Sequence, residues 1–326
     1  MKEFIIKFND SGQRLDKFLQ KTATGLSKGM LYKSIRTKKI KLNGKRTDGA
    51  VILSEGDVIR CYINDDFFKD IRHSHDAASK YDFIKAPSQL QIVYEDDHIL
   101  IVFKPVGLVV HDDDRKSEDT LINRVLHHLY KSGTYIPEKE NSFAPALCNR
   151  LDRNTCGLVI AAKNAAALRE VNRLIRANRI HKSYLCITAK SPPKKRDILH
   201  AYHYKPDGSK TVKISAKNLE GYREIITKYN VLSANGKLSL VKIDLVTGRT
   251  HQIRAHMAFI GAPLLGDNKY GNAEINKQYN EKYQQLCAYK LFFETEKDSL
   301  LAYLNGKRFV SEQPAFIRKY FSGFKL

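Results

Sequence analysis

A single acidic residue between two arginines is the first group in this sequence whose type and spacing could support chemistry. In "CNRLDRNTCGLVI", Asp152 lies between Arg150 and Arg153, directly before an apolar stretch. The Asn, Thr and Gly residues that follow interrupt any helical pattern, so we expect Asp152 on a loop that enters a strand. Rigid sheets often position reactive groups on such loops. Taken alone, however, an acid of this kind is more often part of an ordinary ion pair.

A second group of polar side chains lies in "TGRTHQIRAH", where Arg249, His251 and Arg254 gather at the expected start of a helix. Free N–H groups and the helix dipole favour negative charge there, so the stretch could bind an anion. A polar helix face is the alternative interpretation. Lys104, at a Lys-Pro corner after an apolar strand, and Tyr184, on a strand, are also consistent with a purely structural role.

The common cofactor and metal motifs do not occur in the sequence. It has no G-x-G-x-x-G opening a helix after a strand, no phosphate-binding loop, no H-x-E followed by C-x-x-C and no G-x-S-x-G. The "HSH" of residues 73–75 lies in a polar segment and is typical of solvated histidines rather than of a metal site. We therefore expect side chains alone to carry the chemistry, without a cofactor or a metal.

The net charge is the most informative bulk property. The 326 residues include 56 Lys and Arg against 35 Asp and Glu, a formal net charge of +21. Such an excess favours a polyanionic partner, because it attracts phosphates and releases their counterions. Trp is absent, and the longest purely aliphatic and aromatic run, Ile99–Phe103, has five residues. We therefore expect a nucleic acid rather than a membrane as the partner.

The cysteines and the N-terminal residues indicate the compartment. The five cysteines are scattered and form no C-x-x-C pair, which is typical of a reducing environment. The stretch "MKEFIIKFND" has too few apolar residues together for a signal peptide. These features predict a cytoplasmic protein.

The elements that must position these residues divide into two domains. In residues 1–63, helical spacing over 14–20 and 29–40 is followed by an Asn43-Gly44 hairpin turn and an alternating strand. This segment has 14 Lys and Arg against 6 Asp and Glu. Residues 64–90 are predicted to be a linker, and residues 91–326 a second domain.

The second domain alternates predicted strands and helices. Strands are expected at "LQIVYEDD", "HILIVFKP", "GLVIAAKN" and "KSYLCITAK", and a helix from about Asn164 to Asn178 with Asn164 as its N-cap. A hairpin turns at Asn235-Gly236, and the helix after "TGRTHQ" ends at Gly261. Hairpins with interspersed helices predict an α+β class, with a mixed, largely antiparallel central sheet and flanking helices.

Five segments, in this order, resemble the RluA-type pseudouridine synthases: "KPVGLVVH", "NRLDRNTCGLVIAAK", "HKSYLCI", "TGRTHQIRAHMAFIGAPLLGDNKYG" and "LCAYKL". Residues 1–63 resemble the small αL-type α/β RNA-binding domain that often precedes that catalytic domain. The resemblance covers the chain apart from the linker, and the segments around Asp152 and Arg249–Arg254 are its most specific parts. It implies the pseudouridine synthase fold and a cofactor-free isomerisation of uridine in RNA.

The resemblance also implies roles for individual residues. Asp152 would be the nucleophile, and Arg150 would help to displace the flipped base and take its place. Tyr184 would pack on the target base and is the candidate for removing its C5 proton, while Arg254 would pair with the catalytic acid. A carboxylate suits covalent catalysis, and a neighbouring guanidinium helps to keep it ionised.

The sequence departs from the family pattern at three positions. Asn149 replaces the usual His before the Arg-Leu-Asp triplet, Cys156 replaces a Ser, and Cys287 replaces a later His. None of these residues is assigned to chemistry. We expect Asn149 to contact a phosphate or the backbone, and Cys156 to be a small buried side chain.

Basic residues predict where RNA binds. Between Lys163 and Arg196, ten Lys and Arg stand against one Glu. We expect the substrate-binding set to be Lys104, Arg150, Arg249 and His251 together with the helix residues Arg169, Arg173 and Arg176, the last three contacting phosphates. In the N-terminal domain the predicted RNA-binding residues are Arg14, Lys17, Lys28, Lys33, Arg36, Lys38 and Lys39.

These observations together predict a cytoplasmic, monomeric RNA pseudouridine synthase. Large-subunit (23S) ribosomal RNA is the expected substrate, with tRNA as the alternative. A non-catalytic RNA-binding factor of ribosome assembly on the same fold is a rival hypothesis, as is another metal-free RNA-modifying enzyme. The sequence leaves open whether Asp152 first attacks the ribose or the base.

Overall fold

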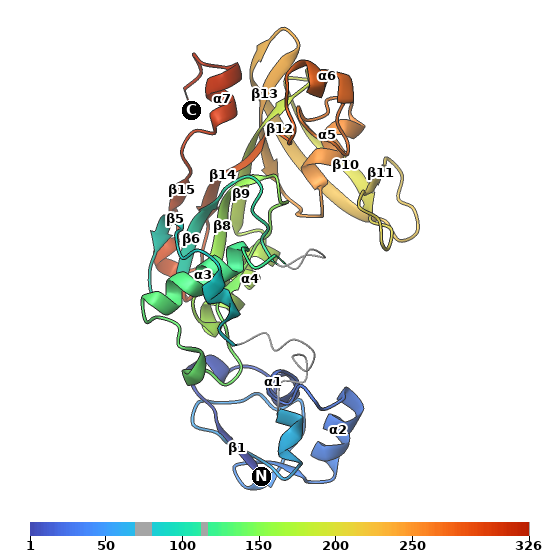
Figure 1. Cartoon of the computed structure of the whole chain (residues 1–326). Coiled ribbons are helices and arrows are strands. Elements are labelled where there is room, and N and C mark those ends of the chain that lie inside the picture. The colour runs from blue at the N-terminus through green and yellow to red at the C-terminus, as the bar shows by residue number, and fades with distance from the viewer. Residues whose placement is uncertain (69–79, 112–116, 326) are drawn as a thin grey trace.

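The computed structural model of the protein describes residues 1–68, 80–111 and 117–325. Two parts follow one another along the chain, each with its own sheet and its own apolar core. In Figure 1 the smaller N-terminal part, in blue, lies at one end of the molecule, and the larger part extends away from it.

The N-terminal part packs two helices against a small antiparallel sheet of strand order β1-β4-β2-β3. Leu15, Phe18 and Leu19 of α1 are buried together with Leu31 and Ile35 of α2, as their helical spacing predicts. The elements are α1 (Leu15–Thr22), α2 (Lys28–Arg36), β1 (Lys2–Ile5), β2 (Ile40–Leu42), β3 (Lys45–Arg46) and β4 (Val58–Cys61).

Helix α2 is shorter than the predicted range of 29–40. The Ser27 side chain caps it by accepting a hydrogen bond from the Met30 N–H, and the helix ends at Arg36. Lys38 then has a φ of 62°, and the chain enters β2 at Ile40. Ile40 has the apolar spacing expected of α2, but it is buried as the first residue of β2. For this reason the predicted helix was too long.

Both predicted Asn-Gly turns join antiparallel strands. Asn43 and Gly44 connect β2 to β3 with φ values of 50° and 75°, as expected for a type I′ turn. Asn235 is the last residue of β12, and Gly236, with a φ of 69°, lies in the turn that leads to β13. These local signals were sufficient to predict the hairpins.

The larger part is built on an 11-stranded sheet of order β11-β10-β12-β13-β9-β14-β8-β6-β5, with β15 beside β14 and β7 beside β8. Of the strand pairs found in the described residues of this sheet, β8 and β14 alone run parallel. This arrangement confirms the predicted α+β class with a largely antiparallel sheet. The strands are β5 (Gln91–Glu95), β6 (Ile99–Lys104), β7 (Ala146–Leu147), β8 (Cys156–Ala162), β9 (Ile180–Thr188), β10 (Arg196–Tyr204), β11 (Lys213–Ser215), β12 (Arg223–Asn235), β13 (Leu238–Leu245), β14 (Leu286–Phe293) and β15 (Arg308–Val310).

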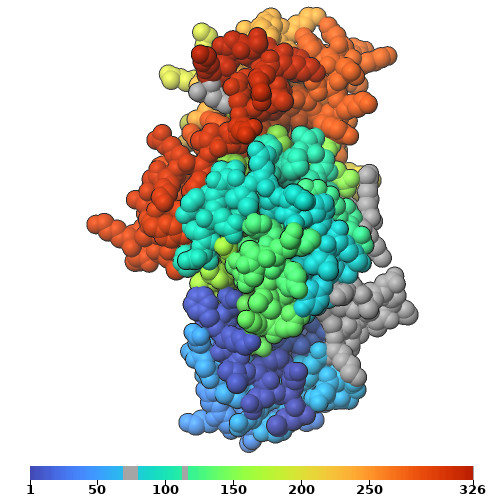
Figure 2. Space-filling model, turned by 60° about the vertical axis from the view of Figure 1, so that its left-hand side comes forward, coloured from blue at the N-terminus to red at the C-terminus, as the bar shows by residue number. Residues whose placement is uncertain are grey.

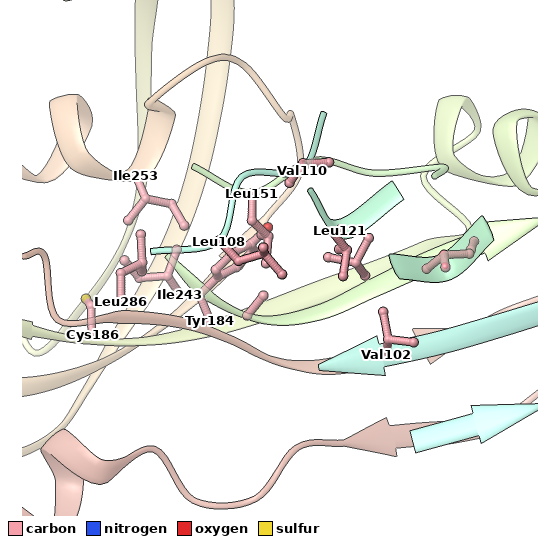
Figure 3. Packing of buried hydrophobic residues seen from close by; sticks show 14 of the residues in the cluster. Val102, Leu108, Val110, Leu121, Leu151, Tyr184, Cys186, Ile243, Ile253 and Leu286 are labelled. Atoms are coloured by element: carbon pink, nitrogen blue, oxygen red, sulfur yellow. The ribbon is translucent and has the colours of Figure 1, made fainter. Parts of the chain in front are cut away.

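Different helices cover the two faces of the sheet, because successive strand residues point to opposite sides. Helices α3 (Leu121–Lys131) and α5 (Gln252–Phe259) pack on the face that carries Val159 and Tyr184, which we call the site face. Helix α4 (Ala165–Arg176) packs on the opposite, back face with Leu158. The remaining helices are α6 (Ala273–Gln278) and α7 (Ala315–Tyr320). Figure 3 shows apolar residues of the site face close to one another.

The two parts are joined by polar contacts. The fully buried Asp10 carboxylate accepts hydrogen bonds of 2.7 Å from Asn141 Nδ2 and from Ser142 Oγ. Asn9 Oδ1 accepts a hydrogen bond of 3.1 Å from the Ala165 N–H at the start of α4. In Figure 2 the blue N-terminal part lies directly against green residues of the larger part. The N-terminal part is thus docked on the larger part rather than merely tethered to it.

The structure describes only part of the predicted linker, residues 64–90. Its ends form short 3-10 turns at Asp65–Phe68 and Asp82–Lys85. Residues 69–79 lie outside the described part of the chain, and with them the "HSH" segment of residues 73–75. The exact domain boundaries stay a prediction.

Candidate active site

Asp152 lies on the loop that connects β7 to β8. Asn149 holds this loop against β8, since its Oδ1 accepts a hydrogen bond from the Ile160 N–H at 2.8 Å and its Nδ2 donates to the Leu158 carbonyl at 3.3 Å. The Thr155 N–H donates to the Asp152 carbonyl oxygen at 3.0 Å and closes a turn. The Asn that replaces the family's His is therefore a backbone anchor, a role that uses both its donor and its acceptor.

The strand after this loop passes unusually close to β14. Gly157 has a φ of 124°, and a Cβ at this position would lie 2.3 Å from the Ala288 carbonyl oxygen. The preceding residue, Cys156, is aligned with Cys287 across the parallel pair β8–β14, and both are free thiols. Cys156 is half-buried and its Sγ lies 3.7 Å from the Leu286 carbonyl oxygen. A glycine is required here because the two backbones leave no room for a side chain.

Lys104 supports the Asp152 loop through hydrogen bonds to backbone carbonyl groups. It is fully buried, and its ammonium group donates to the carbonyl oxygens of Pro105 at 2.9 Å, Leu108 at 2.8 Å and Arg153 at 2.9 Å. Burial lowers the pKa of Lys104 to about 8. The predicted substrate contact of Lys104 is corrected, because all three of its protons bind the backbone and none of its surface is exposed.

The Asp152 carboxylate is paired with Arg254, 102 residues later in the chain. Arg254 Nη1 donates to Asp152 Oδ2 at 2.7 Å, and 6% of the Arg254 side chain and 27% of the Asp152 side chain are exposed. On its other side Arg254 is held by Asp267, with Nε to Oδ2 at 2.7 Å and Nη2 to Oδ1 at 2.8 Å. The guanidinium also lies 5.4 Å from the centre of the Tyr270 ring. The structure therefore brings together the acid and the arginine that the sequence paired.

Asp267 is a site residue that the sequence analysis did not single out. Its side chain is fully buried, and its Oδ1 also accepts hydrogen bonds from the Lys269 N–H at 2.8 Å and the Tyr270 N–H at 3.1 Å. Burial acts to raise the pKa of the Asp267 carboxyl, but the hydrogen bonds from Arg254 and from the backbone outweigh it and lower that pKa. The sequence signal that could have indicated Asp267 is its position in "GDNKYG", directly after Gly266. In the structure a Cβ at Gly266 would lie 2.0 Å from the Tyr283 carbonyl oxygen, so this position requires glycine.

Tyr184 lies on β9 at the site face. It is 6% exposed and belongs to the same apolar cluster as Leu151, the residue before Asp152. Figure 3 shows Tyr184 grouped with Leu151 and Leu108. Burial, together with the charge of Asp152, raises the pKa of the Tyr184 phenol above its ordinary value. The hydroxyl is therefore neutral over the whole physiological pH range.

The side chain of Gln252 fixes the segment before α5 by hydrogen bonds. This buried side chain accepts hydrogen bonds from the Thr247 hydroxyl at 2.9 Å and the Arg249 N–H at 3.0 Å, and it donates to Ile226 and Thr227. The side chain of Arg249 is consequently left exposed at the surface. It makes no hydrogen bond or ion pair with the other described residues, and its role in substrate binding stays a prediction.

Two other predicted substrate contacts, Arg150 and His251, lie near Asp152. Arg150 is exposed and has no hydrogen bond or ion pair with any residue that the structure describes. His251 precedes α5, and its Nε2 lies 3.9 Å from Asp152 Oδ2. Both side chains are thus placed where a bound nucleotide could reach them.

Helix α4, predicted to contact phosphates, packs on the back face of the sheet. Arg169 Nη1 donates to the Ser11 carbonyl oxygen at 3.1 Å, so it takes part in the contact with the N-terminal part. Arg173 is ion-paired with Glu296 at 2.7 Å, while Arg176 is exposed. The structure therefore does not bring these arginines to the loop that carries Asp152. Binding of phosphates by this helix stays a prediction, and Arg176 is its best candidate.

The predicted RNA-binding residues of the N-terminal part are all exposed: Arg14, Lys17, Lys28, Lys33, Arg36, Lys38 and Lys39. Of these, Arg14 is paired with Asp16 at 2.8 Å. Their contact with RNA stays a prediction.

The described residues contain no group of three His, Cys, Asp or Glu side chains arranged to hold a metal ion. None of their helices has the length and apolar character needed to span a bilayer.

Comparison with known proteins identifies the family. Residues 98–259 match the profile of the RNA pseudouridylate synthase family. An uncharacterized RNA pseudouridine synthase of Mycoplasma capricolum is 33% identical over 312 residues, covering 94% of this chain and 96% of the relative. The ribosomal large subunit pseudouridine synthase C of Rickettsia conorii is 32% identical over 266 residues, which covers 80% of this chain and 83% of the relative. The chain belongs to the RNA pseudouridine synthase family, and it is an isomerase that acts on RNA.

Solved structures agree on the fold. The human RNA pseudouridylate synthase domain containing 1 aligns with a TM-score of 0.56 at 22% identity, over 72% of this chain and 87% of that protein. The human RNA pseudouridylate synthase domain containing 4 aligns with a TM-score of 0.55 at 21% identity, over 73% of this chain and 93% of that protein.

Proposed function

We propose that the protein converts uridines of large-subunit (23S) ribosomal RNA to pseudouridine, with Asp152 as the nucleophile. The observation that carries this proposal is that Arg254 binds one oxygen of the carboxylate. Asp152 Oδ1 accepts no hydrogen bond from the described residues, and 27% of the side chain is exposed. The guanidinium gives the carboxylate a charge-assisted hydrogen bond at one oxygen, and the other oxygen remains open for attack.

The isomerisation breaks the bond between N1 and the ribose and forms a bond from C5 to the same ribose carbon. N1 gains a proton and C5 loses one, so no cofactor is needed for the balance. Between the breaking of the N1 bond and the release of the product, Asp152 holds the substrate by a covalent bond, which it forms and later releases. Tyr184, beside it, packs on the base; its raised phenol pKa favours this role over that of a base, because a neutral phenol accepts protons poorly.

The target nucleotide must leave the RNA stack to reach Asp152. Extrusion costs a few kcal/mol, and a side chain that fills the gap offsets part of this cost. Arg150 is exposed and two residues from Asp152, and its planar guanidinium can stack on bases. We propose that the Arg150 side chain fills the space that the extruded base leaves in the RNA stack.

Ribosomal RNA is the proposed substrate on two grounds. Relatives from Rickettsia conorii and Escherichia coli are named ribosomal large subunit pseudouridine synthase C. The docked N-terminal part adds a second exposed basic surface, which suits a large structured RNA. We further propose that the protein acts as a monomer in the cytoplasm, where its five free thiols stay reduced.

Release of tritium from C5-labelled uridine in ribosomal RNA and in tRNA tests the reaction and the substrate together. Asp152→Asn should abolish release while RNA affinity changes less than about twofold, because the variant keeps the shape of the side chain. Asp298→Asn, which removes an exposed carboxylate without a partner among the described residues, is the matched control. Release by Asp152→Asn at the rate of the control would refute the nucleophile. Release from tRNA and not from ribosomal RNA would refute the substrate.

Mapping pseudouridines in cellular RNA with and without the gene gives the target. The expected result is the loss of one or more pseudouridines from large-subunit ribosomal RNA. An unchanged ribosomal RNA would contradict the proposed substrate, independently of the experiment with purified protein.

A further inference from the structure

His251 has an unusual backbone conformation next to the catalytic acid. It is the residue before α5, with a φ of 53° and a ψ of 19°. This left-handed region is uncommon for residues other than glycine, and such outliers concentrate at functional sites. In this conformation the His251 ring lies between Tyr270 and Asp152, with 13% of its side chain exposed.

Hydrogen bonds at the Tyr270 hydroxyl determine where the His251 ring carries its proton. The hydroxyl oxygen accepts a hydrogen bond of 2.8 Å from the Val212 N–H, which can only donate. The same oxygen lies 2.8 Å from His251 Nδ1. Among the described residues, Nδ1 is the acceptor within hydrogen-bond distance of the hydroxyl proton, which favours donation from the hydroxyl to Nδ1. With that donation Nδ1 is unprotonated, and the proton of the neutral ring is on Nε2.

The charge state of the ring agrees with this assignment. Burial lowers the pKa of His251 to about 4. Asp152 and Asp267 act in the opposite direction, whereas Arg254 and Lys269 add to the effect of burial. The ring is consequently neutral at pH 7, and a neutral ring has one donor and one acceptor nitrogen.

The donor nitrogen is directed into the site, where the described residues offer it no acceptor at full hydrogen-bond distance. His251 Nε2 is 3.9 Å from Asp152 Oδ2, beyond the usual range of 2.7–3.2 Å. That oxygen already accepts the hydrogen bond from Arg254. The Nε2–H group is thus available to an oxygen of a molecule bound at Asp152.

We propose that Tyr270 is a positioning residue that holds His251 as the tautomer protonated on Nε2, and that this N–H donates a hydrogen bond to an oxygen of the uridine bound at Asp152. The proposal rests on the proposed function of Asp152 for the identity of the bound molecule, but not for the tautomer. Tyr270 is suited to the task because its position is fixed twice, by Val212 at its hydroxyl and by Asp267 at its N–H.

Imidazole ¹⁵N–¹H correlation spectra of the full-length protein labelled at histidine test the tautomer without RNA. The His251 signals are identified by their loss in His251→Gln. The expected pattern is a proton on Nε2 and none on Nδ1 from pH 5.5 to 8, and a mixture of tautomers in Tyr270→Phe. A proton on Nδ1, or a doubly protonated ring at pH 7, overturns the proposal.

Single-turnover tritium release tests the donor. His251→Gln keeps an N–H near the position of Nε2, whereas His251→Leu removes it, and both variants carry the same strain at positive φ. Leu should lower the rate by about 10 to 100-fold, as expected for one lost hydrogen bond to the substrate, and Gln should restore at least about a third of the wild-type rate. Equal losses in Gln and Leu overturn the donor role.

Tyr270→Phe separates positioning from binding. It removes the hydroxyl and keeps the ring that lies against Arg254. We expect the kcat to fall about tenfold and the KM to change less than twofold, while Tyr283→Phe, at an exposed tyrosine outside the site, has no effect. A wild-type rate in Tyr270→Phe refutes the positioning role. If the wild-type protein releases no tritium from any RNA, the proposed function fails, whereas the spectra still decide the tautomer.

Discussion

Replacing Asp267 by Asn should damage both the fold and the reaction, because Asp267 is the buried counterion that holds Arg254. The carboxylate accepts two hydrogen bonds from Arg254 and two from backbone N–H groups, with its side chain fully buried. An amide has the same shape, but its NH₂ group would face the Nε–H or the Nη2–H of Arg254, donor against donor. The guanidinium would then retain Asp152 as its anionic partner.

The magnitude follows from these contacts. Removing one partner of a buried ion pair costs about 3–5 kcal/mol, and the backbone hydrogen bonds that an Asn oxygen can keep place this variant near the lower end, about 3 kcal/mol. At roughly 2–4 °C per kcal/mol, the Tm of the catalytic part should fall by about 6–12 °C. A displacement of Arg254 by about 1 Å would lower the rate of tritium release by up to about 10²-fold.

Thermal unfolding and single-turnover release, measured side by side with Asp298→Asn as the surface control, check both numbers. The control should melt and react like the wild type. The reasoning is refuted if Asp267→Asn melts within 1–2 °C of the control and reacts at its rate, since Arg254 would then not depend on Asp267.

Three further predictions concern other parts of the molecule. Gly157→Ala should lower the free energy of unfolding by about 2–4 kcal/mol, because the new Cβ would clash with the backbone of β14 at a positive φ. Urea unfolding measures this change, and unchanged stability would contradict the close approach of the two strands. Replacing Lys33, Arg36 and Lys39 together by Ala should weaken RNA binding. In titrations at several salt concentrations, the slope of the logarithm of the RNA association constant against the logarithm of the salt concentration should fall in magnitude by about 2–3. An unchanged slope would show that RNA does not bind at these residues. Burial lowers the pKa of His256 to about 4, so as the pH falls from about 6.5 to 4 the unfolded chain takes up a proton that the folded chain does not. The free energy of unfolding should therefore fall by up to about 1.4 kcal/mol per pH unit in that window, and His256→Gln should reduce this acid sensitivity in Tm measurements from pH 7 to 4.5.

The sequence was most informative where a signal is local. The Asn-Gly hairpins, the capping of α4 by Asn164 and the class of the fold were all predicted correctly, because they depend on backbone preferences and on apolar spacing within one segment. Asp152 and Arg254 were recognised from short, specific motifs. The end of α2 was predicted less well, because Ile40 continues the apolar spacing while belonging to the next strand.

By itself, then, the sequence determined those helices and hairpins that have clear local signals, which charge the partner must have and which residues belong to the family's motifs. Only the tertiary structure decided which side chains meet. It placed α4 on the back face, turned Lys104 inward onto three carbonyl oxygens and added Asp267 and Tyr270 to the site. The physical reason is that periodicity states which side of an element is apolar, whereas the sheet face that a helix covers, and the partner that a buried charge requires, depend on residues a hundred positions away.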